Sequence, residues 1–173
     1  MKTLILGGIR SGKSRLAEHL AIQSGLPVTY LATATVGDTE MAERIAAHQI
    51  RRPGHWTLVE EPLALATAMQ AHARHGHCLI VDCLTLWLTN LLLADQPSAL
   101  TEQRHDLMSK LSNLPGEIIL VSNETNMGIV PLGELSRKYC DEAGRLHQNL
   151  AIDCDRVVLA VAGLPHIIKG PAL

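Results

Sequence analysis

The sequence contains no phenylalanine and only two tryptophans and two tyrosines, although 47% of its 173 residues are hydrophobic. Its core must therefore be built mainly from aliphatic side chains. Charged residues make up 18% of the chain, which is typical of a globular protein rather than a disordered one. The formal net charge of −2 provides no electrostatic basis for binding nucleic acid or an anionic membrane surface.

Long apolar runs are also missing. The first ten residues, MKTLILGGIR, hold too short an apolar run for a signal peptide. The most apolar later stretch, at 79–95, is broken by Asp82 and falls short of a bilayer span. The four cysteines form no CxxC pair, and Cys78 and Cys83 lie in an apolar strand pattern that favours buried thiols. We expect a cytoplasmic protein.

Continuous apolar runs alternate with helical patterns along the chain. Such runs favour strands buried on both faces of a parallel sheet, and they lie at 3–7, 28–33, 78–82, 118–122 and 157–161. Helical patterns lie near 13–24, 39–51, 62–75, 98–113 and 132–151. Pro62 suits a first helical position, and Gly25 and Gly76 suit helix ends. We predict an α/β fold, with a mostly parallel sheet and helices on both faces, in a single domain over residues 1–173.

The strongest local signal is GGIRSGKS at 7–14, which fits G-x-x-x-x-G-K-[ST] between a predicted strand and a predicted helix. In this context the glycines allow backbone N–H groups to surround a phosphate. Lys13 would reach the β- and γ-phosphates and Ser14 would bind Mg²⁺. The alternative is a glycine-rich turn that happens to precede a helix. The candidate nucleotide-binding residues here are Gly7, Gly8, Ile9, Arg10, Ser11, Gly12, Lys13 and Ser14.

Asp82 is the candidate carboxylate for the metal. It ends the run CLIVD and should emerge at the carboxyl edge of a buried strand, where ligands of open α/β sheets bind. A charge there is costly unless it is paired or linked to a metal. The alternative is that Asp82 caps a helix that begins near Leu84.

His48 lies in the segment ERIAAHQIRRPGHW at 43–56. Met41, Ile45 and His48 follow helical spacing, so His48 could be only the solvent-exposed end of a core stripe. However, Arg44, Arg51 and Arg52 surround it in sequence. Arginines would attract phosphate oxygens and would lower the pKa of the imidazole, which keeps it neutral and nucleophilic. Spacing alone leaves both interpretations open.

Other titratable clusters carry weaker signals. His72, His75 and His77 could be metal ligands, but a solvated cluster at a helix C-terminus is the simpler interpretation. Similarly, the charged residues of 136–148 are most simply a solvated helix face.

Taken with these residues, the chain resembles the bifunctional adenosylcobinamide kinase / adenosylcobinamide-phosphate guanylyltransferases of cobalamin biosynthesis. The resemblance runs from end to end. It rests on GGIRSGKS (7–14), YLAT (30–33), EMAERIAAHQIRRPGHW (40–56), EEP (60–62), VDCLTLWLTNLL (81–92), VSNETNMGIVP (121–131) and AGRLHQNLA (143–151). The phosphate loop alone is common to many enzymes, whereas this series of motifs in this order is specific.

The resemblance implies two reactions. A nucleoside triphosphate phosphorylates the aminopropanol hydroxyl of adenosylcobinamide; GTP then guanylylates His48, and GMP passes to the cobinamide phosphate to form adenosylcobinamide-GDP. It also implies a RecA-like P-loop fold and a homotrimer, while Mg²⁺ is the cofactor expected from the phosphate loop and Asp82. Further nucleotide-contacting positions carried over from the family are Thr33, Ala34, Thr35, Gln49, Ile50, Arg51, Arg52, Glu60 and Asp82.

Two competing hypotheses remain. One is a small P-loop kinase that acts on another metabolite, with His48 only lining the site. The other is a GTP-binding switch protein, but no guanine-reading N-K-x-D-like tetrapeptide follows a strand, and VSNE at 121–124 is a poor match. Neither the preferred phosphate donor, ATP or GTP, nor the residue that deprotonates the cobinamide hydroxyl follows from the sequence. Glu124 and the MGIVP loop could contact either the substrate or a neighbouring subunit.

Overall fold

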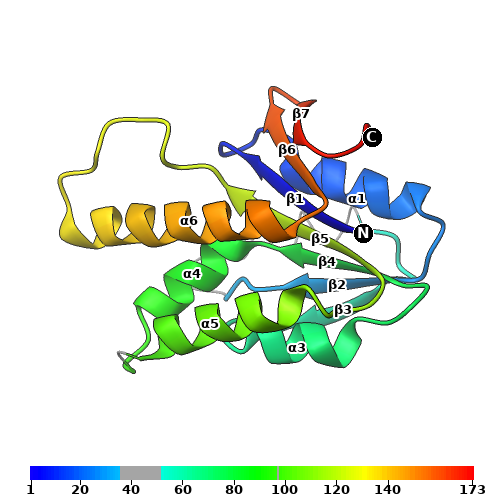
Figure 1. Ribbon diagram of the computed structural model, residues 1–173, viewed down its shortest axis with the longest axis horizontal. Coiled ribbons are helices and arrows are strands. Elements are labelled where there is room, and N and C mark those ends of the chain that lie inside the picture. The colour runs from blue at the N-terminus through cyan, green and yellow to red at the C-terminus, as the bar shows by residue number, and fades with distance from the viewer. Residues whose placement is uncertain (36–51, 97) are drawn as a thin grey trace.

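The apolar runs form the central strands of a seven-stranded sheet in a computed structural model that describes residues 1–35, 52–96 and 98–173 (Figure 1). The sheet order is β3-β2-β4-β5-β1-β6-β7, and every neighbouring pair is parallel except β6 and β7. The strands are β1 (Lys2–Gly7), β2 (Val28–Ala32), β3 (Thr57–Glu60), β4 (Cys78–Asp82), β5 (Glu117–Asn123), β6 (Arg156–Val161) and β7 (Leu164–Lys169). The predicted α/β architecture is confirmed.

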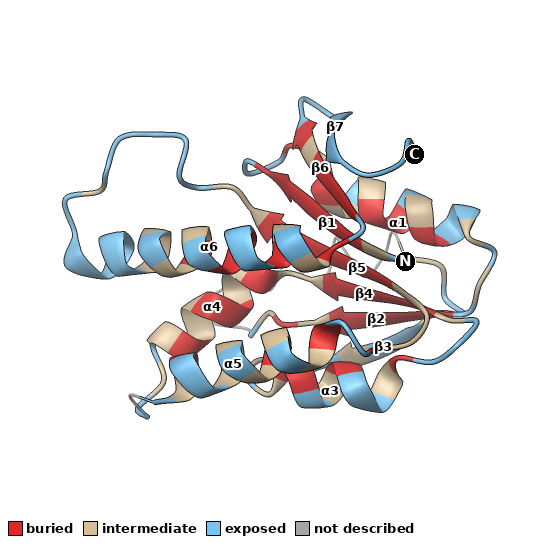
Figure 2. Cartoon of the chain, in the orientation of Figure 1, coloured by how far each residue is buried: buried red, intermediate tan, exposed pale blue. Residues whose placement is uncertain are grey.

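Helices cover both faces of the sheet. The helices of the described residues are α1 (Lys13–Gln23), α3 (Leu65–His72), α4 (Leu84–Leu92), α5 (Ala99–Leu111) and α6 (Glu134–Asp153). Alternate side chains of one strand enter different cores: Ile5 packs with Ala17 of α1, whereas Leu4 joins the larger core under α3 to α6. Burial on both faces explains why the central strands are continuously apolar (Figure 2). No helix in the described ranges is long and apolar enough to cross a membrane.

Three elements were not among the predicted strands and helices, although the alternative role of Asp82 assumed a helix near Leu84. The strand β3 has four residues at a sheet edge and is largely exposed, and β7 contains Pro165 on the opposite edge, so neither has the buried apolar pattern of an internal strand. The helix α4, LTLWLTNLL, is apolar on most sides and follows the apolar run of β4 almost directly. Its sequence therefore shows no clear helical period.

Two predicted helix boundaries are wrong. The helix predicted from 62 begins at Leu65, because the Glu61 carboxylate accepts hydrogen bonds from the N–H groups of Leu63 and Ala64 and holds a turn there. The same helix ends at His72, and Gly76 lies in a separate turn in which His77 N–H donates to Arg74 O. The helix predicted at 39–51 lies outside the described residues.

Candidate nucleotide-binding active site

The loop after β1 has the backbone conformation that its glycines permit. Gly7 has a φ of +154°, and a Cβ there would lie 2.4 Å from the carbonyl oxygen of Ala160. Gly12 has a φ of +97° and precedes the first residue of α1. The loop is also bonded to the turn between β6 and β7, where the N–H of Gly163 donates to Ser11 O over 2.9 Å. These positions explain why glycine is needed at both ends of the motif.

The side chains of the loop fit a phosphate group. Lys13 is 7% exposed and its Nζ donates to Gly8 O at 2.7 Å, so the ammonium group is held against the loop backbone. Burial lowers the pKa of Lys13, and the negative charge of Asp82 opposes that shift. The hydroxyl oxygen of Ser11 is buried and has no hydrogen-bond partner among the described residues. A phosphate would provide acceptors for these donors, together with those at the N-terminus of α1.

Asp82 lies at the carboxyl end of β4 and is held there by a tyrosine. The Tyr30 hydroxyl donates to Asp82 Oδ2 at 2.6 Å. The helix α4 has Cys83 as its N-cap residue and no side-chain capping hydrogen bond. The alternative that Asp82 caps this helix is therefore wrong, and the carboxylate remains a candidate for a metal role.

Tyr30 also contacts the end of the arginine-rich segment. The Arg52 guanidinium carbon lies 3.6 Å from the centroid of the Tyr30 ring, and the ring of Trp56 stacks with it at a centroid separation of 6.5 Å and an interplanar angle of 25°. Burial raises the pKa of Tyr30, and the negative charge of Asp82 raises it further, so the phenol stays protonated and remains a donor. One ring thus connects Arg52 to Asp82.

Thr33 ties the ends of β2 and β4 together. Its Oγ1 donates to Cys83 O at 2.6 Å and accepts from Cys83 N–H at 3.0 Å, and the side chain is fully buried. Glu60 ends β3, and Ala32 is paired in register with both Glu60 and Asp82. The candidate residues Thr33, Glu60 and Asp82 therefore lie together at the carboxyl ends of β2, β3 and β4. Ala34 and Thr35 follow Thr33 directly.

The donor set at this edge fits Mg²⁺. Ser14, in the first turn of α1, offers a hydroxyl and Asp82 a carboxylate, which are the hard oxygen ligands that Mg²⁺ prefers. Within the described ranges no group of three His, Cys, Asp or Glu side chains could hold a metal by itself. At Mg²⁺ sites that form with a bound nucleotide, substrate phosphates and water complete the coordination.

A buried polar residue that was not predicted from the sequence lies next to the carboxyl end of β5. The imidazole Nε2 of His147, on α6, lies 2.8 Å from Ser122 Oγ, and its Nδ1 lies 3.7 Å from Glu124 Oε2. His147 is 6% exposed, so the prediction of a solvated helix face over 136–148 is wrong at this position. Helical spacing could have found it, because His147 falls four residues after the buried Ala143.

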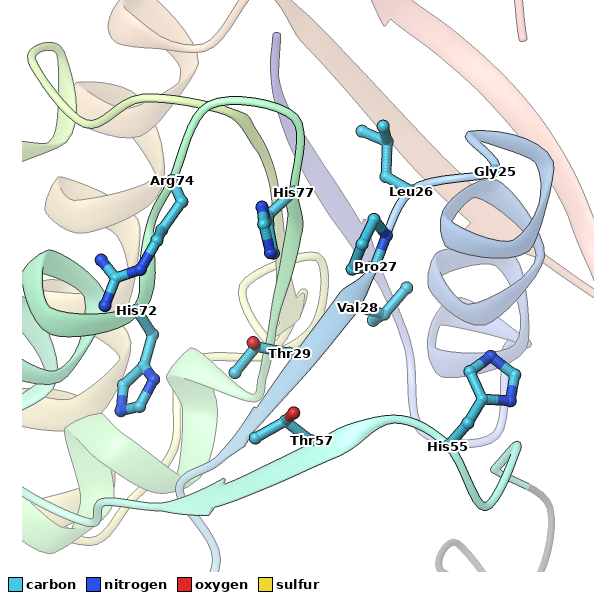
Figure 3. Close-up of a pocket in the computed structure, with 10 residues that line it drawn as sticks. All are labelled: Gly25, Leu26, Pro27, Val28, Thr29, His55, Thr57, His72, Arg74 and His77. Carbon is cyan, nitrogen blue, oxygen red and sulfur yellow. The ribbon is translucent and has the colours of Figure 1, made fainter.

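A cavity lies at the opposite end of the strands from the phosphate loop. It measures about 490 Å³ and is bordered by the amino ends of β2 and β3 and by the segment between α3 and β4 (Figure 3). His72 and His77 line it, with Arg74 and His55, while His75 is exposed. These histidines are therefore separated from the phosphate loop by the length of the strands. His48, Gln49, Ile50 and Arg51 lie outside the described residues.

The chain is similar to bacterial proteins of known name over its whole length. It is 62% identical over 173 residues to the bifunctional adenosylcobalamin biosynthesis protein CobP of Pseudomonas aeruginosa, with all of both chains covered. It is 38% identical over 182 aligned positions to the bifunctional adenosylcobalamin biosynthesis protein CobU of Salmonella typhimurium, with 98% of this chain and 100% of that protein covered. The Escherichia coli protein of the same name is 36% identical with the same coverage.

Solved structures share the fold at low sequence identity. A Pyrococcus horikoshii OT3 protein matches with a TM-score of 0.54 and 11% identity, over 99% of this chain and 87% of that one. The RadB recombinase matches with a TM-score of 0.51 and 14% identity, over 91% and 73% respectively. These likenesses, with the strand order and the phosphate loop, show a RecA-like P-loop NTPase fold.

The family model described as "Cobinamide kinase / cobinamide phosphate guanyltransferase" matches residues 3–168, which include the phosphate loop, Tyr30, Asp82 and the polar end of β5. The chain therefore belongs to the cobinamide kinase / cobinamide phosphate guanyltransferase family, and it is an enzyme that combines a kinase with a nucleotidyltransferase activity.

Proposed function

We propose that this enzyme phosphorylates the aminopropanol hydroxyl of adenosylcobinamide and then transfers GMP from GTP to the product through a guanylyl-histidine at His48. The final product is adenosylcobinamide-GDP. The observation that carries the proposal is the shared edge of the sheet, where the phosphate loop, Asp82 and Arg52 are brought together. We propose a single domain over residues 1–173 that serves both reactions.

In the kinase step, the substrate hydroxyl oxygen attacks the γ-phosphorus of ATP or GTP, and the bond to the β–γ bridging oxygen breaks. The residues of the loop hold the phosphates: backbone N–H groups bind oxygens, and Lys13 balances the charge of the departing diphosphate. Mg²⁺, bound through Ser14 and Asp82 directly or by way of water, would neutralise charge on the same phosphates. Little covalent chemistry is required of the protein, because positioning supplies most of the catalysis.

In the transfer steps, a neutral His48 nitrogen attacks the α-phosphorus of GTP and pyrophosphate leaves. A phosphate oxygen of adenosylcobinamide phosphate then attacks the same phosphorus, and His48 departs. Arg51 and Arg52 would bind phosphate oxygens of the nucleotide, while Thr33, Ala34, Thr35, Gln49, Ile50 and Glu60 complete the nucleotide contacts. The position of Arg52 against Tyr30 supports this assignment, since it places a guanidinium beside the residue that holds Asp82.

We further propose that the enzyme is cytoplasmic and acts as a homotrimer. Support for an assembly comes from the segment before α6, where Met127, Ile129, Val130 and Leu132 are all strongly exposed, with Ile129 and Leu132 at 97%. A surface segment with this many apolar side chains commonly contacts another surface. The adenosylcobinamide substrate is the other candidate occupant.

Intact-mass analysis tests the function directly. After incubation with GTP and Mg²⁺, the protein should gain the mass of one GMP per modified chain, through an acid-labile and base-stable linkage. Addition of adenosylcobinamide phosphate should discharge the label into adenosylcobinamide-GDP. A kinase of another metabolite or a GTP-binding switch would show no covalent nucleotide, and that result would overturn the proposal.

A further inference from the structure

Three polar residues, Ser122, Asn123 and Glu124, follow the apolar part of β5 at the edge of the sheet that carries the phosphate loop. The strand β5 lies between β4 and β1, so these residues emerge between Asp82 and the loop. The contacts are direct: Glu124 N–H donates to Gly7 O at 2.9 Å. This strand end is thus part of the site, although the chemistry described above makes no use of its side chains.

Glu124 is mostly buried and, within the residues that the structure describes, lies beside His147 rather than beside a lysine or an arginine. Its side chain is 14% exposed, and no lysine or arginine of the described residues forms an ion pair with it. Its Oε1 accepts a hydrogen bond from Asn126 N–H at 2.7 Å, and its Oε2 faces His147. These two contacts hold the carboxylate at the end of the sheet that carries the phosphate loop.

His147, on α6, is the residue that faces the Glu124 carboxylate. Burial lowers the pKa of His147, while the negative charge of Glu124 opposes that shift. In the neutral ring, we assign the proton to Nδ1, so that Nε2 accepts from the Ser122 hydroxyl at 2.8 Å. Nδ1 then has no hydrogen-bond partner within the described ranges, because Glu124 Oε2 is 3.7 Å away. A buried N–H aimed at a carboxylate from just outside hydrogen-bonding distance can close on it when a substrate is bound.

The other carboxylates at this edge are already engaged or lie farther along the sheet. Asp82 accepts from Tyr30, and Glu61 accepts from the N–H groups of Leu63 and Ala64. Glu60 is on the edge strand β3, which is separated from β5 by β2 and β4. Among these acidic residues of the described ranges, Glu124 is the one whose backbone is bonded to the phosphate loop and to which the steps above assign no role.

We propose, on the basis of the kinase step in the proposed function, that Glu124 is the general base for phosphorylation, with His147 and Ser122 as positioning residues. As the substrate oxygen bonds to the γ-phosphorus and the nucleoside diphosphate leaves, the hydroxyl proton passes to Glu124 Oε2. The proton is released to water when the products depart. Guanylylation of His48 needs no such base, because a neutral imidazole nitrogen already carries the attacking electron pair. The two reactions therefore depend on Glu124 to different extents.

The first test compares Glu124→Gln with Glu134→Gln, an exposed glutamate in the first turn of α6. Both half-reactions are measured on each purified protein: phosphorylation of adenosylcobinamide, and formation of the GMP adduct by intact mass. Glu124→Gln should lower the kinase kcat by about 100- to 10,000-fold. Its KM for the nucleotide and its rate of GMP adduct formation should remain close to wild type, as should both rates of Glu134→Gln.

Each outcome of this test is decisive. Near-normal phosphorylation by Glu124→Gln overturns the inference. Loss of both half-reactions also overturns it, because it assigns Glu124 to the nucleotide site or to folding rather than to proton transfer. If the wild-type enzyme forms a GMP adduct but does not phosphorylate adenosylcobinamide, the proposed function itself fails, and the assignment of Glu124 fails with it.

The second test separates positioning by His147 from simple packing. Asparagine keeps an N–H donor near the Nδ1 position, whereas leucine fills the space with an apolar side chain. If the Nδ1 donor matters, His147→Leu should lower the kinase kcat by up to about 100-fold, and His147→Asn should retain most of it. A packing role predicts the reverse order, since leucine suits a buried site better. That reverse order would remove His147 from the proposal.

Discussion

The hydroxyl of Tyr30 donates to Asp82 Oδ2 over 2.6 Å while the ring of the same tyrosine lies under the Arg52 guanidinium. Oδ2 of Asp82 is therefore occupied by a protein donor, and in our proposal the carboxylate contacts the metal or its water through Oδ1. The contact also links two strands, β2 and β4, to the end of the arginine-rich segment. Groups assigned to the metal and groups assigned to the nucleotide phosphates are consequently held in one rigid unit.

Removal of the Tyr30 hydroxyl should weaken metal use without removing the ring under Arg52. In Tyr30→Phe, Asp82 loses its fixed donor, so we expect a higher Mg²⁺ concentration for half-maximal rate in both half-reactions. We also expect a loss of about 1.5–3 kcal/mol in the free energy of unfolding, as for a hydrogen bond to a charged group. Magnesium titrations and denaturant unfolding measure these effects.

The chain offers a matched control in its only other tyrosine, Tyr139. The Tyr139 hydroxyl is buried and has no hydrogen bond to a carboxylate in the part of the chain that the structure describes. Tyr139→Phe should leave the Mg²⁺ dependence unchanged and should lower stability less than Tyr30→Phe, because it removes no hydrogen bond to a charged group. An equal shift in both variants would show that Tyr30 has no specific role toward Asp82.

Lys13 should be required for the kinase and important for guanylylation. Lys13→Ala removes the ammonium group that balances charge on the departing phosphates, so we expect kinase activity to fall by several orders of magnitude. Guanylylation should weaken too, because pyrophosphate leaves from the same loop. Steady-state assays of a folded variant, with Lys110→Ala on the surface of α5 as control, provide the measurement. Kinase rates near those of wild type would contradict the phosphate-loop assignment.

Asp82 should control the metal dependence. Because Asp82 does not cap α4, replacement by asparagine leaves the start of that helix unaffected, and the protein should remain folded. The neutral amide binds a divalent cation more weakly than a carboxylate, so Asp82→Asn should raise the Mg²⁺ concentration needed for half-maximal activity. Circular dichroism checks the fold. An unchanged Mg²⁺ titration would argue against a metal role for this residue.

The stability of the protein should fall as the pH drops below the ordinary histidine pKa of 6.5, partly because of His147. Burial lowers the pKa of His147 in the folded protein, so below pH 6.5 the unfolded chain binds a proton that the folded chain does not. This contribution to stability is present above that pH and is lost below it. Denaturant unfolding at a series of pH values should show a smaller loss for His147→Asn than for wild type. Parallel curves would contradict the assignment.

The parts of the site that could be predicted from sequence are those formed by neighbouring residues. The phosphate loop is one local motif in which glycines, lysine and serine must follow a strand and open a helix, so its sequence alone specifies its structure. Asp82 could be placed for a similar reason, because it ends an apolar strand. The same logic located the five strands that are buried on both faces.

Contacts between distant segments could not be predicted in this way. Tyr30 and Asp82 are 52 residues apart in sequence, and His147 and Ser122 are 25 residues apart. Each pair depends on strand order and on the rotation of a helix, neither of which a local pattern contains. The edge strands β3 and β7 were missed for the opposite reason: their local pattern resembles that of exposed loops.

His48 is the residue on which the second activity depends in our proposal, and it can be separated from the first. A nucleophile for nucleotidyl transfer must be neutral, must reach the α-phosphorus, and must leave again when the second acceptor attacks. Histidine meets these demands because its pKa lies near neutrality and its bond to phosphorus is labile. The kinase step requires only the phosphate loop, the metal and a positioned hydroxyl. His48→Ala should therefore abolish guanylyl transfer and leave phosphorylation of adenosylcobinamide largely intact.

The exposed His55, seven residues further along the chain, provides the control for this experiment. His55→Ala should form the GMP adduct like wild type, whereas His48→Ala should show no gain in mass with GTP and Mg²⁺. Peptide mapping of the wild-type adduct should place the label on His48. If His48→Ala still produced adenosylcobinamide-GDP, or if the label mapped to another residue, His48 would be only the solvent-exposed end of the stripe formed by Met41 and Ile45. The nucleophile would then have to be sought among the other side chains at the carboxyl edge of the sheet, where the phosphate loop and Asp82 fix the position of the nucleotide.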